Sequence, residues 1–391
     1  MHDIARLVPT DEGLNHQIPQ TFAAVLHSDP TWTEKIWTTI ARKDGSLQVD
    51  FGLGKYTNLN VIDGFGGVSM GRKQWTVRAS RALFPDSEKS AVGPLEYSVI
   101  EPLKRVRFVL AENKEAAVSF ELDFEAALPP YFEDRHIQRS NTGSRAVADL
   151  VRYHQAGTVS GTIRVDGKTY QVKPDEWFAF RDHSWGIRPG VGQPANILRA
   201  GSSATNDPIA SGFDPQARFF LNWSPIVLQT PQGTQYEFQY YYMAAGDVPF
   251  YSSGYVNHPD GSQERIISIR PELTYHPKTR MLTGGKIHFQ TQPGKTRTIE
   301  VEPVGESGFY LGLGLYFGLD GFNHGMWRGP LHVEGEYVEN CLNRETLERI
   351  HQLRDRPIRV REGDASGYGI MESTVTGEWP SLGLSREDSY V

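Results

Sequence analysis

Short runs in which apolar and polar residues alternate recur along most of the chain. A period of two is typical of a β-strand, because successive side chains point to opposite faces. Asp166-Gly167 is the sharpest turn signal in the sequence and is typical of a two-residue hairpin turn. Three pairs of alternating runs are separated by turn residues and predict β-hairpins: residues 36–40 with 47–51, 106–110 with 118–124, and 162–165 with 168–172.

The second half of the chain shows the same alternation. Its clearest run is an aromatic ladder of period two, made of Tyr236, Phe238, Tyr240 and Tyr242. Pro- and Gly-containing turns separate this run from further predicted strands near residues 219–223, 267–269 and 296–302.

One segment has the period of a helix instead. Residues 343–354 place Leu347, Ile350 and Leu353 on one face, and Asn343 is a suitable N-cap. Many short strands with a single helix predict an all-β protein in which helix makes up under about 15% of the residues. Antiparallel sheets of this kind protect their edges by closing into barrels or packing as sandwiches.

The length of 391 residues is enough for two β domains. A Gly-, Pro- and Ser-rich stretch at residues 188–215 is the natural place for a break between two barrel-like halves. We therefore predict an N-terminal arm at residues 1–30, a first β domain at 31–195 and a second at 196–391.

Composition narrows the function classes. The net charge is −7 and no basic cluster is present, which gives no support to nucleic-acid binding or to a role at an anionic membrane. Apolar runs are too short for a transmembrane helix, and the N-terminus lacks the pattern of a secretory signal. Cys341 is the single cysteine, so an intrachain disulfide is excluded. We expect a cytoplasmic protein.

Residues 182–186, Asp-His-Ser-Trp-Gly, form the most informative segment. On a strand, His183 and Trp185 share one face and Asp182 lies on the other. One interpretation is a hydrogen-bonded structural pair beside a buried indole. The other is an aromatic pocket that moves a proton, with His183 and Asp182 as catalytic residues and Trp185 binding the substrate.

The segment also carries a family resemblance. Asp182-His183-Ser184-Trp185-Gly186, after the hairpin that begins at Gly161, resembles the Asp-His-x-Trp-Gly signature of a lipocalin-like superfamily. That superfamily comprises carotenoid 1,2-hydratases (hydroxyneurosporene synthases), AttH proteins, and fungal pericyclases and hydratases. Residues 34–40 resemble its N-terminal Glu-x-Trp strand more loosely, and residues 152–188 look closest to an uncharacterised bacterial branch. The resemblance implies two lipocalin-like antiparallel domains and isoprenoid-like substrates.

Other stretches are weaker candidates for the same pocket. His154 precedes the hairpin that leads to residue 182, and it lines the pocket only if those strands pair; ordinary strand packing is the alternative. His324, Trp327 and Arg328 lie in a glycine-rich loop, where pocket lining competes with packing. Near the C-terminus, Tyr368 or Glu372 could supply an acid, although a closing strand is the plainer interpretation. Tyr240 and Tyr242 are expected to line the pocket from the second half.

The sequence lacks the motifs of several familiar classes of enzyme. The chain has no Gly-x-Ser-x-Gly elbow, no dinucleotide fingerprint and no zinc motif, so we expect neither a cofactor nor a metal. The leading hypothesis is a cofactor-independent proton-transfer enzyme, a hydratase, dehydratase, isomerase or cyclase, acting on an isoprenoid- or sterol-like molecule. A carrier of hydrophobic ligands and a carbohydrate-active lyase or binding protein remain alternatives.

Overall fold

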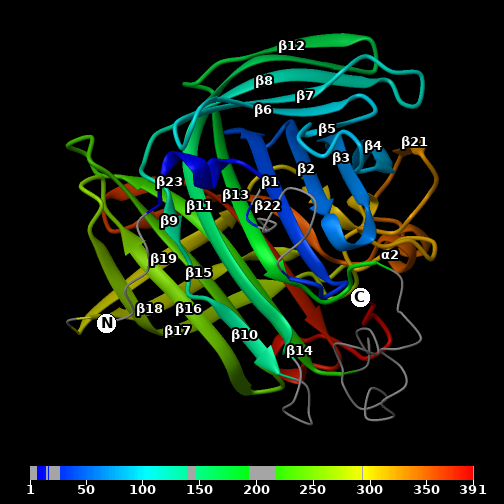
Figure 1. Cartoon of the computed structure of the whole chain (residues 1–391). Coiled ribbons are helices and arrows are strands. Elements are labelled where there is room, and N and C mark those ends of the chain that lie inside the picture. The colour runs from blue at the N-terminus through cyan, green and yellow to red at the C-terminus, as the bar shows by residue number, and fades with distance from the viewer. Residues whose placement is uncertain are drawn as a thin grey trace.

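The protein was analysed as a computed structural model, which describes residues 7–14, 16, 27–139, 146–192, 217–292 and 294–390. The described strands form two antiparallel sheets (Figure 1). Most of the predicted break, residues 193–215, lies outside the described residues, and the division into domains stays a prediction.

The first sheet runs in the order β21-β4-β3-β2-β1-β13-β11-β8-β7-β6-β5, and β9, β10 and β12 also pair with β11. Its strands are β1 (Trp32–Arg42), β2 (Gln48–Tyr56), β3 (Val61–Met70), β4 (Lys73–Ala82), β5 (Ala91–Val92), β6 (Leu95–Glu101), β7 (Arg105–Leu110), β8 (Val118–Ala126), β9 (Tyr131–Phe132), β10 (His136–Arg139), β11 (Ala146–Val165), β12 (Lys168–Val172), β13 (Trp177–Ile187) and β21 (Leu331–Val338). The three predicted hairpins are confirmed as β1–β2, β7–β8 and β11–β12. Although β21 comes from the second half of the chain, it pairs with β4.

The second sheet contains β14 (Phe219–Gln229), β15 (Gln235–Ala245), β16 (Val248–Asn257), β17 (Gln263–Tyr275), β18 (Leu282–Thr291), β19 (Lys295–Pro303), β20 (Phe309–Tyr310), β22 (Arg354–Glu362) and β23 (Ala365–Thr376). Neighbouring strands pair from β14 to β19, and β23 joins β14 to β22. The additional pairing of β19 with β22 closes these strands into a ring. The all-β prediction is therefore confirmed, with one closed sheet and one curled, open sheet.

The predicted C-terminal helix is present but shorter than its apolar period suggested. α2 (Arg344–Ile350), the one α-helix among the described residues, follows Asn343 at the N-cap position and buries Leu347 and Ile350. It ends at His351, whose φ of 50° leaves the helical region, so Leu353 falls outside it. In the described part of the chain, no helix is both long and apolar enough to span a membrane.

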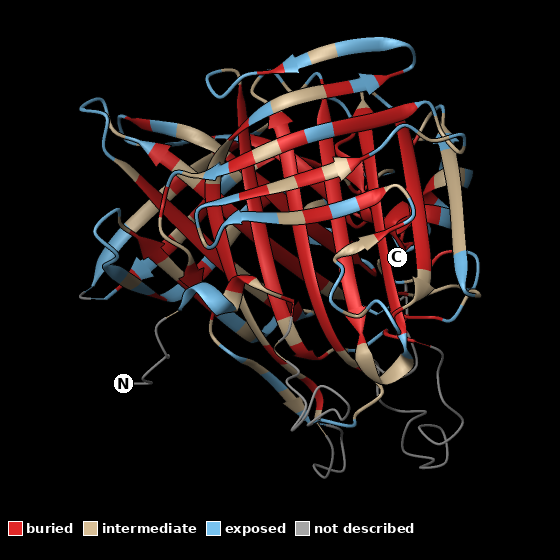
Figure 2. Cartoon of the chain, turned by 45° about the horizontal axis from the view of Figure 1, so that its top comes forward, coloured by how far each residue is buried: buried red, intermediate tan, exposed pale blue. Residues whose placement is uncertain are grey.

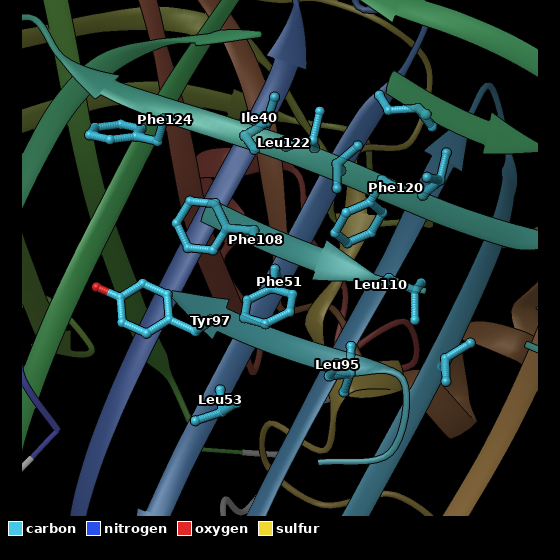
Figure 3. Packing of buried hydrophobic residues seen from close by; sticks show 14 of the residues in the cluster. Ile40, Phe51, Leu53, Leu95, Tyr97, Phe108, Leu110, Phe120, Leu122 and Phe124 are labelled. Carbon is cyan, nitrogen blue, oxygen red and sulfur yellow. The ribbon is translucent and has the colours of Figure 1, made fainter. Parts of the chain in front are cut away.

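The first core lies inside the curl of the first sheet. Figure 3 shows β6, β7 and β8 crossing over β1 and β2, with their apolar side chains facing each other. Phe51 lies 5.5 Å from Phe108 and 6.4 Å from Phe120, between ring centroids. A separate core fills the ring of the second sheet, where Phe238 and Phe289 pack together.

A third layer lies between the two sheets. The central strands of the first sheet are buried on both faces, as Figure 2 shows in red. One face packs on the first core, and the other packs against the second sheet through residues that include Trp37 and Trp223. Polar residues that alternate along β1 and β2 are therefore buried in this layer instead of facing solvent.

Candidate functional site

Strand β13 carries the motif at residues 182–186 and separates two environments. It lies between β1 and β11, with His183 opposite Ile36 of the first core and Asp182 opposite Trp37 of the intersheet layer. The ring centroids of His183 and Trp185 are 5.3 Å apart. The motif therefore presents its imidazole and its carboxylate to opposite sides of one sheet.

The backbone explains why glycine stands at position 186 of this motif. Its φ is 130°, and a Cβ atom at this position would lie 2.0 Å from the carbonyl oxygen of Asp149 on β11. A side chain would therefore force β11 and β13 apart.

We expect Gly186→Ala to lower the free energy of unfolding by about 2–4 kcal/mol, through backbone strain and overpacking together. Gly190→Ala is the matched control, because Gly190 also has a positive φ but no atom lies within 4 Å of its Cβ position. Urea unfolding measures both variants. Equal losses would show that the close approach of the strands is not the cause.

On the inner face, His183 is fully buried between polar partners. Its Nε2 lies 3.1 Å from Oε1 of Glu34 on β1, and its Nδ1 lies 3.4 Å from the hydroxyl of Tyr153 on β11. His16 joins the group: its Nδ1 lies 2.6 Å from Glu34 Oε1, and its ring stacks on Trp185 with centroids 3.5 Å apart.

The described N-terminal residues reach into this inner face. Glu12, in the short 3-10 helix η1 (Pro9–Glu12), forms a two-pronged ion pair with Arg181 at 2.6 and 2.8 Å. Burial by itself raises the pKa of Glu12, but the charge of Arg181 and hydrogen bonds from Arg181 and Tyr97 lower it to about 2. The carboxylate is therefore ionised and anchors the segment.

The other face of β13 belongs to a buried polar group that we name the intersheet centre: Trp37, Asp50, Glu133, Arg152, Asp182, Trp223, Asp355 and Glu372. Its innermost part contains three carboxyl groups, Asp50 from the first sheet and Asp355 and Glu372 from paired positions on β22 and β23. Asp355 Oδ2 accepts a 2.9 Å hydrogen bond from the Trp37 indole. Asp50 Oδ1 accepts hydrogen bonds from Thr39 and Gln48 at 2.8 and 2.9 Å.

Two other carboxylate oxygens of this trio have no hydrogen-bond donor among the described residues, which indicates that the trio binds a proton. Oδ2 of Asp50 and Oδ1 of Asp355 are buried and receive no hydrogen bond as ionised groups. Hydrogen bonding between Asp50 and Asp355, and between Asp355 and Glu372, contributes to the pKa shifts of these groups. A proton shared between the groups satisfies these oxygens, because a protonated carboxyl is a donor.

Burial and mutual repulsion act in the same direction on these acids. Burial raises the pKa of Asp50, Asp355 and Glu372 above their ordinary values. The charge of Asp50 raises that of Asp355 further, and the charge of Asp355 does the same for Glu372. The intersheet centre is therefore a place where carboxylic acids stay protonated at higher pH than in water.

The second part of the centre holds an arginine between two acids. Arg152 lies 3.3 Å from Glu133 Oε2 and 3.2 Å from Asp182 Oδ2. The Trp223 indole donates to Glu133 Oε1 at 2.9 Å, and its ring meets the Trp37 ring edge to face with centroids 5.3 Å apart. Two indoles thus lie between the two groups of carboxyls.

Lys35 lies beside the centre on β1. It is buried, and its Nζ lies 4.2 Å from the centroid of the Tyr316 ring. Burial lowers the pKa of this amine well below its ordinary value, and Arg188 lowers it further. Nearby, Asp63 accepts a hydrogen bond from the Gly325 amide at 2.7 Å and lies 3.3 Å from His324.

The same layer contains polar atoms without a hydrogen-bond partner in the described protein: Gln48 Oε1, Ser184 Oγ and Gln239 Oε1. Buried polar atoms are otherwise almost always paired with protein, water or ligand. These atoms therefore leave hydrogen-bonding capacity for a polar group of a small molecule.

Comparisons with known proteins place the chain in a family. A sequence profile of the Family of unknown function (DUF8625) matches residues 7–385. The chain belongs to this family. A search of curated protein sequences gives no match.

Solved structures resemble the fold at low identity. An AttH-type protein from Nitrosomonas europaea has a TM-score of 0.53 and 13% identity over 96% of this chain and 98% of that chain. Kievitone hydratase from Nectria haematococca has a TM-score of 0.40 and 10% identity, with 94% and 96% covered. CghA with Sch210972 has a TM-score of 0.44 and 9% identity, with 89% of each chain covered. The AttH-type structure shows that the predicted fold is shared; the bacterial branch stays a prediction.

The structure divides the residues that the sequence predicted to share a pocket. His154 pairs with Asp182 across β11 and β13 and bonds Glu237 at 3.1 Å, so it lies in the intersheet layer and not beside His183. Tyr240 and Tyr242 point into the core of the ring, and Tyr241 between them faces the intersheet layer. His183 and the two tyrosines therefore do not share a pocket. His183 lies on the inner face of the first sheet, and the tyrosines lie in the core of the ring.

The remaining candidates also separate. Trp327 is exposed, and Arg328 forms a two-pronged ion pair with Glu334 at 2.6 and 2.9 Å. Tyr368 stacks on Phe178 in the intersheet layer, with centroids 5.2 Å apart. Of Tyr368 and Glu372, the two candidates for an acid near the C-terminus, Glu372 belongs to the intersheet centre. The catalytic and binding roles of all these residues stay predictions.

Sequence reasoning missed Asp50, Asp355 and Lys35. One signal was available: Gln48 and Asp50 alternate with Val49 and Phe51, which marks a polar strand face. Alternation alone does not say whether such a face meets water or a second sheet. Asp355 lies in an ordinary-looking charged run, and nothing local distinguishes it.

A surface cavity of about 690 Å³ lies at the rim of the ring, lined by residues that include Tyr236, His258, Lys295 and Glu362. Its charged groups already pair with one another, as Arg297 does with Glu362. It contains none of the residues of the intersheet centre and offers no cluster of perturbed acids.

Proposed function

We propose that this protein is an enzyme that transfers protons to and from a small organic molecule at the intersheet centre. The reaction type is hydration, dehydration, isomerisation or cyclisation. The observation that carries the proposal is the buried carboxyl trio Asp50, Asp355 and Glu372, whose pKa values are all raised. In the described part of the chain, one oxygen of Asp50 and one of Asp355 have no hydrogen-bond partner, as expected where a proton is shared. Acids whose pKa is strongly shifted by burial and by neighbouring charges are common at catalytic sites.

The chemistry follows from the protonation of the trio. Addition of water to a double bond begins when an acid gives its proton to carbon, and cyclisation or isomerisation of an alkene can begin in the same way. A carboxylic acid that is still protonated near neutral pH is suited to this step, because its donor form is populated at the operating pH. Its conjugate base then accepts the proton that the product releases.

The aromatic walls suit the cation that such a step creates. Trp37 and Trp223 present indole rings in the same layer, and an indole face stabilises a positive charge. Because the groups are buried, the reaction takes place out of contact with bulk water. We therefore propose a largely apolar, isoprenoid- or sterol-like substrate, and a reaction that requires no organic cofactor.

Asp182 and Arg152 have a positioning role in this proposal. The Arg152 guanidinium lies between Asp182 and Glu133 and keeps positive charge near the acids. Burial raises the pKa of Asp182, and Arg152 opposes that rise. His183 faces the other side of the sheet, so its predicted catalytic role has no part here.

The test begins with the ligand. Native mass spectrometry of the purified protein looks for a co-purified small molecule, and a panel of isoprenoid and sterol-like alkenes and alcohols is incubated with the protein in D₂O. We expect deuterium to enter one member of the panel at carbon in the presence of the wild type. Glu372→Gln is expected to lower this rate by about 10²-fold or more, because one acid of the trio is lost.

Glu300→Gln is the matched control, since Glu300 pairs with Lys286 and Arg361 on the outside of the ring. It should exchange at the wild-type rate. Binding without deuterium incorporation would identify a carrier instead. Exchange that is equal in Glu372→Gln and the wild type would remove the trio from the mechanism.

A further inference from the structure

A second polar group lies on the inner face of the first sheet, outside the intersheet centre. It contains His16, Glu34 and His183, each of which offers one ligand atom, and these atoms lie within 4.8 Å of one another. His16 Nδ1 lies 2.6 Å and His183 Nε2 lies 3.1 Å from the same oxygen, Glu34 Oε1. Two imidazoles and one carboxylate therefore converge on one point.

The second ring nitrogen of His183 also has an oxygen partner. The Tyr153 hydroxyl donates to Glu12 Oε1 at 3.0 Å, so its oxygen is an acceptor for His183 Nδ1, 3.4 Å away. In the tautomer that carries its proton on Nδ1, the imidazole donates to Tyr153 and turns the lone pair of Nε2 toward Glu34.

His16 is arranged in the same sense. Its Nε2 lies 3.3 Å from Oδ1 of Asp11, a carboxylate oxygen that can only accept when ionised. In the tautomer that carries its proton on Nε2, His16 donates to Asp11 and turns the lone pair of Nδ1 toward Glu34 Oε1. The other oxygen of Glu34, Oε2, is already occupied by the backbone N–H of His16 at 2.8 Å.

Without a metal, each imidazole can turn to its other tautomer and donate an N–H to Glu34 Oε1. With both imidazoles in the tautomers described above, a single metal cation takes the place of those two protons. An outer oxygen on the second nitrogen of each histidine is the usual support of a metal-binding imidazole. Two histidines and one carboxylate suit zinc and other divalent first-row metals.

We propose that His16 Nδ1, Glu34 Oε1 and His183 Nε2 bind one divalent transition-metal cation. Bonds of about 2.0–2.1 Å in a tetrahedral site separate ligand atoms by roughly 3.3 Å, so each nitrogen has to move away from Glu34 Oε1 by less than about 1 Å. Trp185, stacked on the His16 ring, covers one side of the site. The cation ties the N-terminal segment to β1 and β13.

Binding is tested with metal alone. Chelator-treated full-length protein is titrated with Zn²⁺ by calorimetry and with Co²⁺ by visible absorption, which reports coordination geometry. We expect one equivalent to bind, and thermal melting to shift upward with Zn²⁺, because the metal binds only the folded arrangement. His16→Ala is expected to lower affinity by at least 100-fold, and Asp11→Ala, which removes the outer acceptor of His16 Nε2, by about 10–100-fold.

His16→Ala is preferred over a change at His183 because His16 is the most exposed of the three ligands. His288→Ala is the matched control, since His288 also bonds a carboxylate, that of Glu272, on the outside of the ring. It should bind Zn²⁺ like the wild type. Absence of Zn²⁺ binding by the wild type, or equal binding by His16→Ala, would overturn the proposal and leave hydrogen bonds from the two imidazoles to Glu34 as the explanation.

Discussion

Replacing Asp355 by asparagine is expected to lower substrate turnover by about 10²–10⁴-fold while the protein remains folded. The amide keeps the shape of the side chain and can still accept the Trp37 hydrogen bond, but it cannot give up a proton at the pH of the reaction. The matched control is Asp123→Asn, because Asp123 pairs with Arg107 at the surface of the first sheet. It should leave turnover unchanged.

The same variant is expected to change the pH dependence of stability. Burial raises the pKa of Asp355, so the folded protein keeps a proton that the unfolded chain releases above about pH 4. The stabilisation is therefore complete below that pH and is lost as the pH rises through the raised pKa. Urea unfolding of the wild type should show this decline, and Asp355→Asn should show a flatter one. Identical pH profiles would show that Asp355 is ionised in the folded protein.

The second large effect is expected at the N-terminal segment. Glu12→Gln should lower the free energy of unfolding by about 3–5 kcal/mol, because it leaves the buried Arg181 without its counter-charge. The pKa of Glu12 is lowered to about 2, so the contribution of this pair is present above about pH 4.5 and is lost as the pH falls toward 2.

Glu306→Gln is the matched control, because it shows how much the free energy of unfolding falls when an exposed ion pair is removed. Glu306 pairs with Arg72, and both side chains are more than half exposed, so its loss should cost about 0–1 kcal/mol. Chemical unfolding at pH 7 compares the two variants. A cost for Glu12→Gln no larger than that for Glu306→Gln would mean that the segment does not help to hold the first sheet together.

The fold was accessible from the sequence because its strands are local patterns. Alternation and Asp166-Gly167 predicted the β11–β12 hairpin, and the same logic gave β1–β2. The helix near the C-terminus was found but drawn too long, because Leu353 keeps the helical spacing while the backbone turns away at His351. Pairing of β21 with the distant β4 has no local signal.

The site was accessible only in part. Alternation placed His183 and Asp182 on opposite faces of one strand, as β13 shows. It could not tell that both faces are buried, since that depends on a second sheet, which begins at Phe219, packing over the first. Asp50 and Asp355 meet across 305 positions of sequence, and a raised pKa depends on that meeting. The sequence pattern predicts which strand faces are polar. Tertiary packing determines which of those faces are buried and which of their acids have a raised pKa.

The central claim is that a carboxylic acid in the intersheet centre is protonated at neutral pH. Infrared difference spectroscopy across a pH titration measures this directly, because the C=O stretch of a protonated carboxyl differs from the stretches of a carboxylate. We expect the wild type to show a protonated carboxyl band at pH 7 that Asp355→Asn or Glu372→Gln diminishes and Asp123→Asn retains. A wild-type spectrum at pH 7 with carboxylate bands alone would contradict the account.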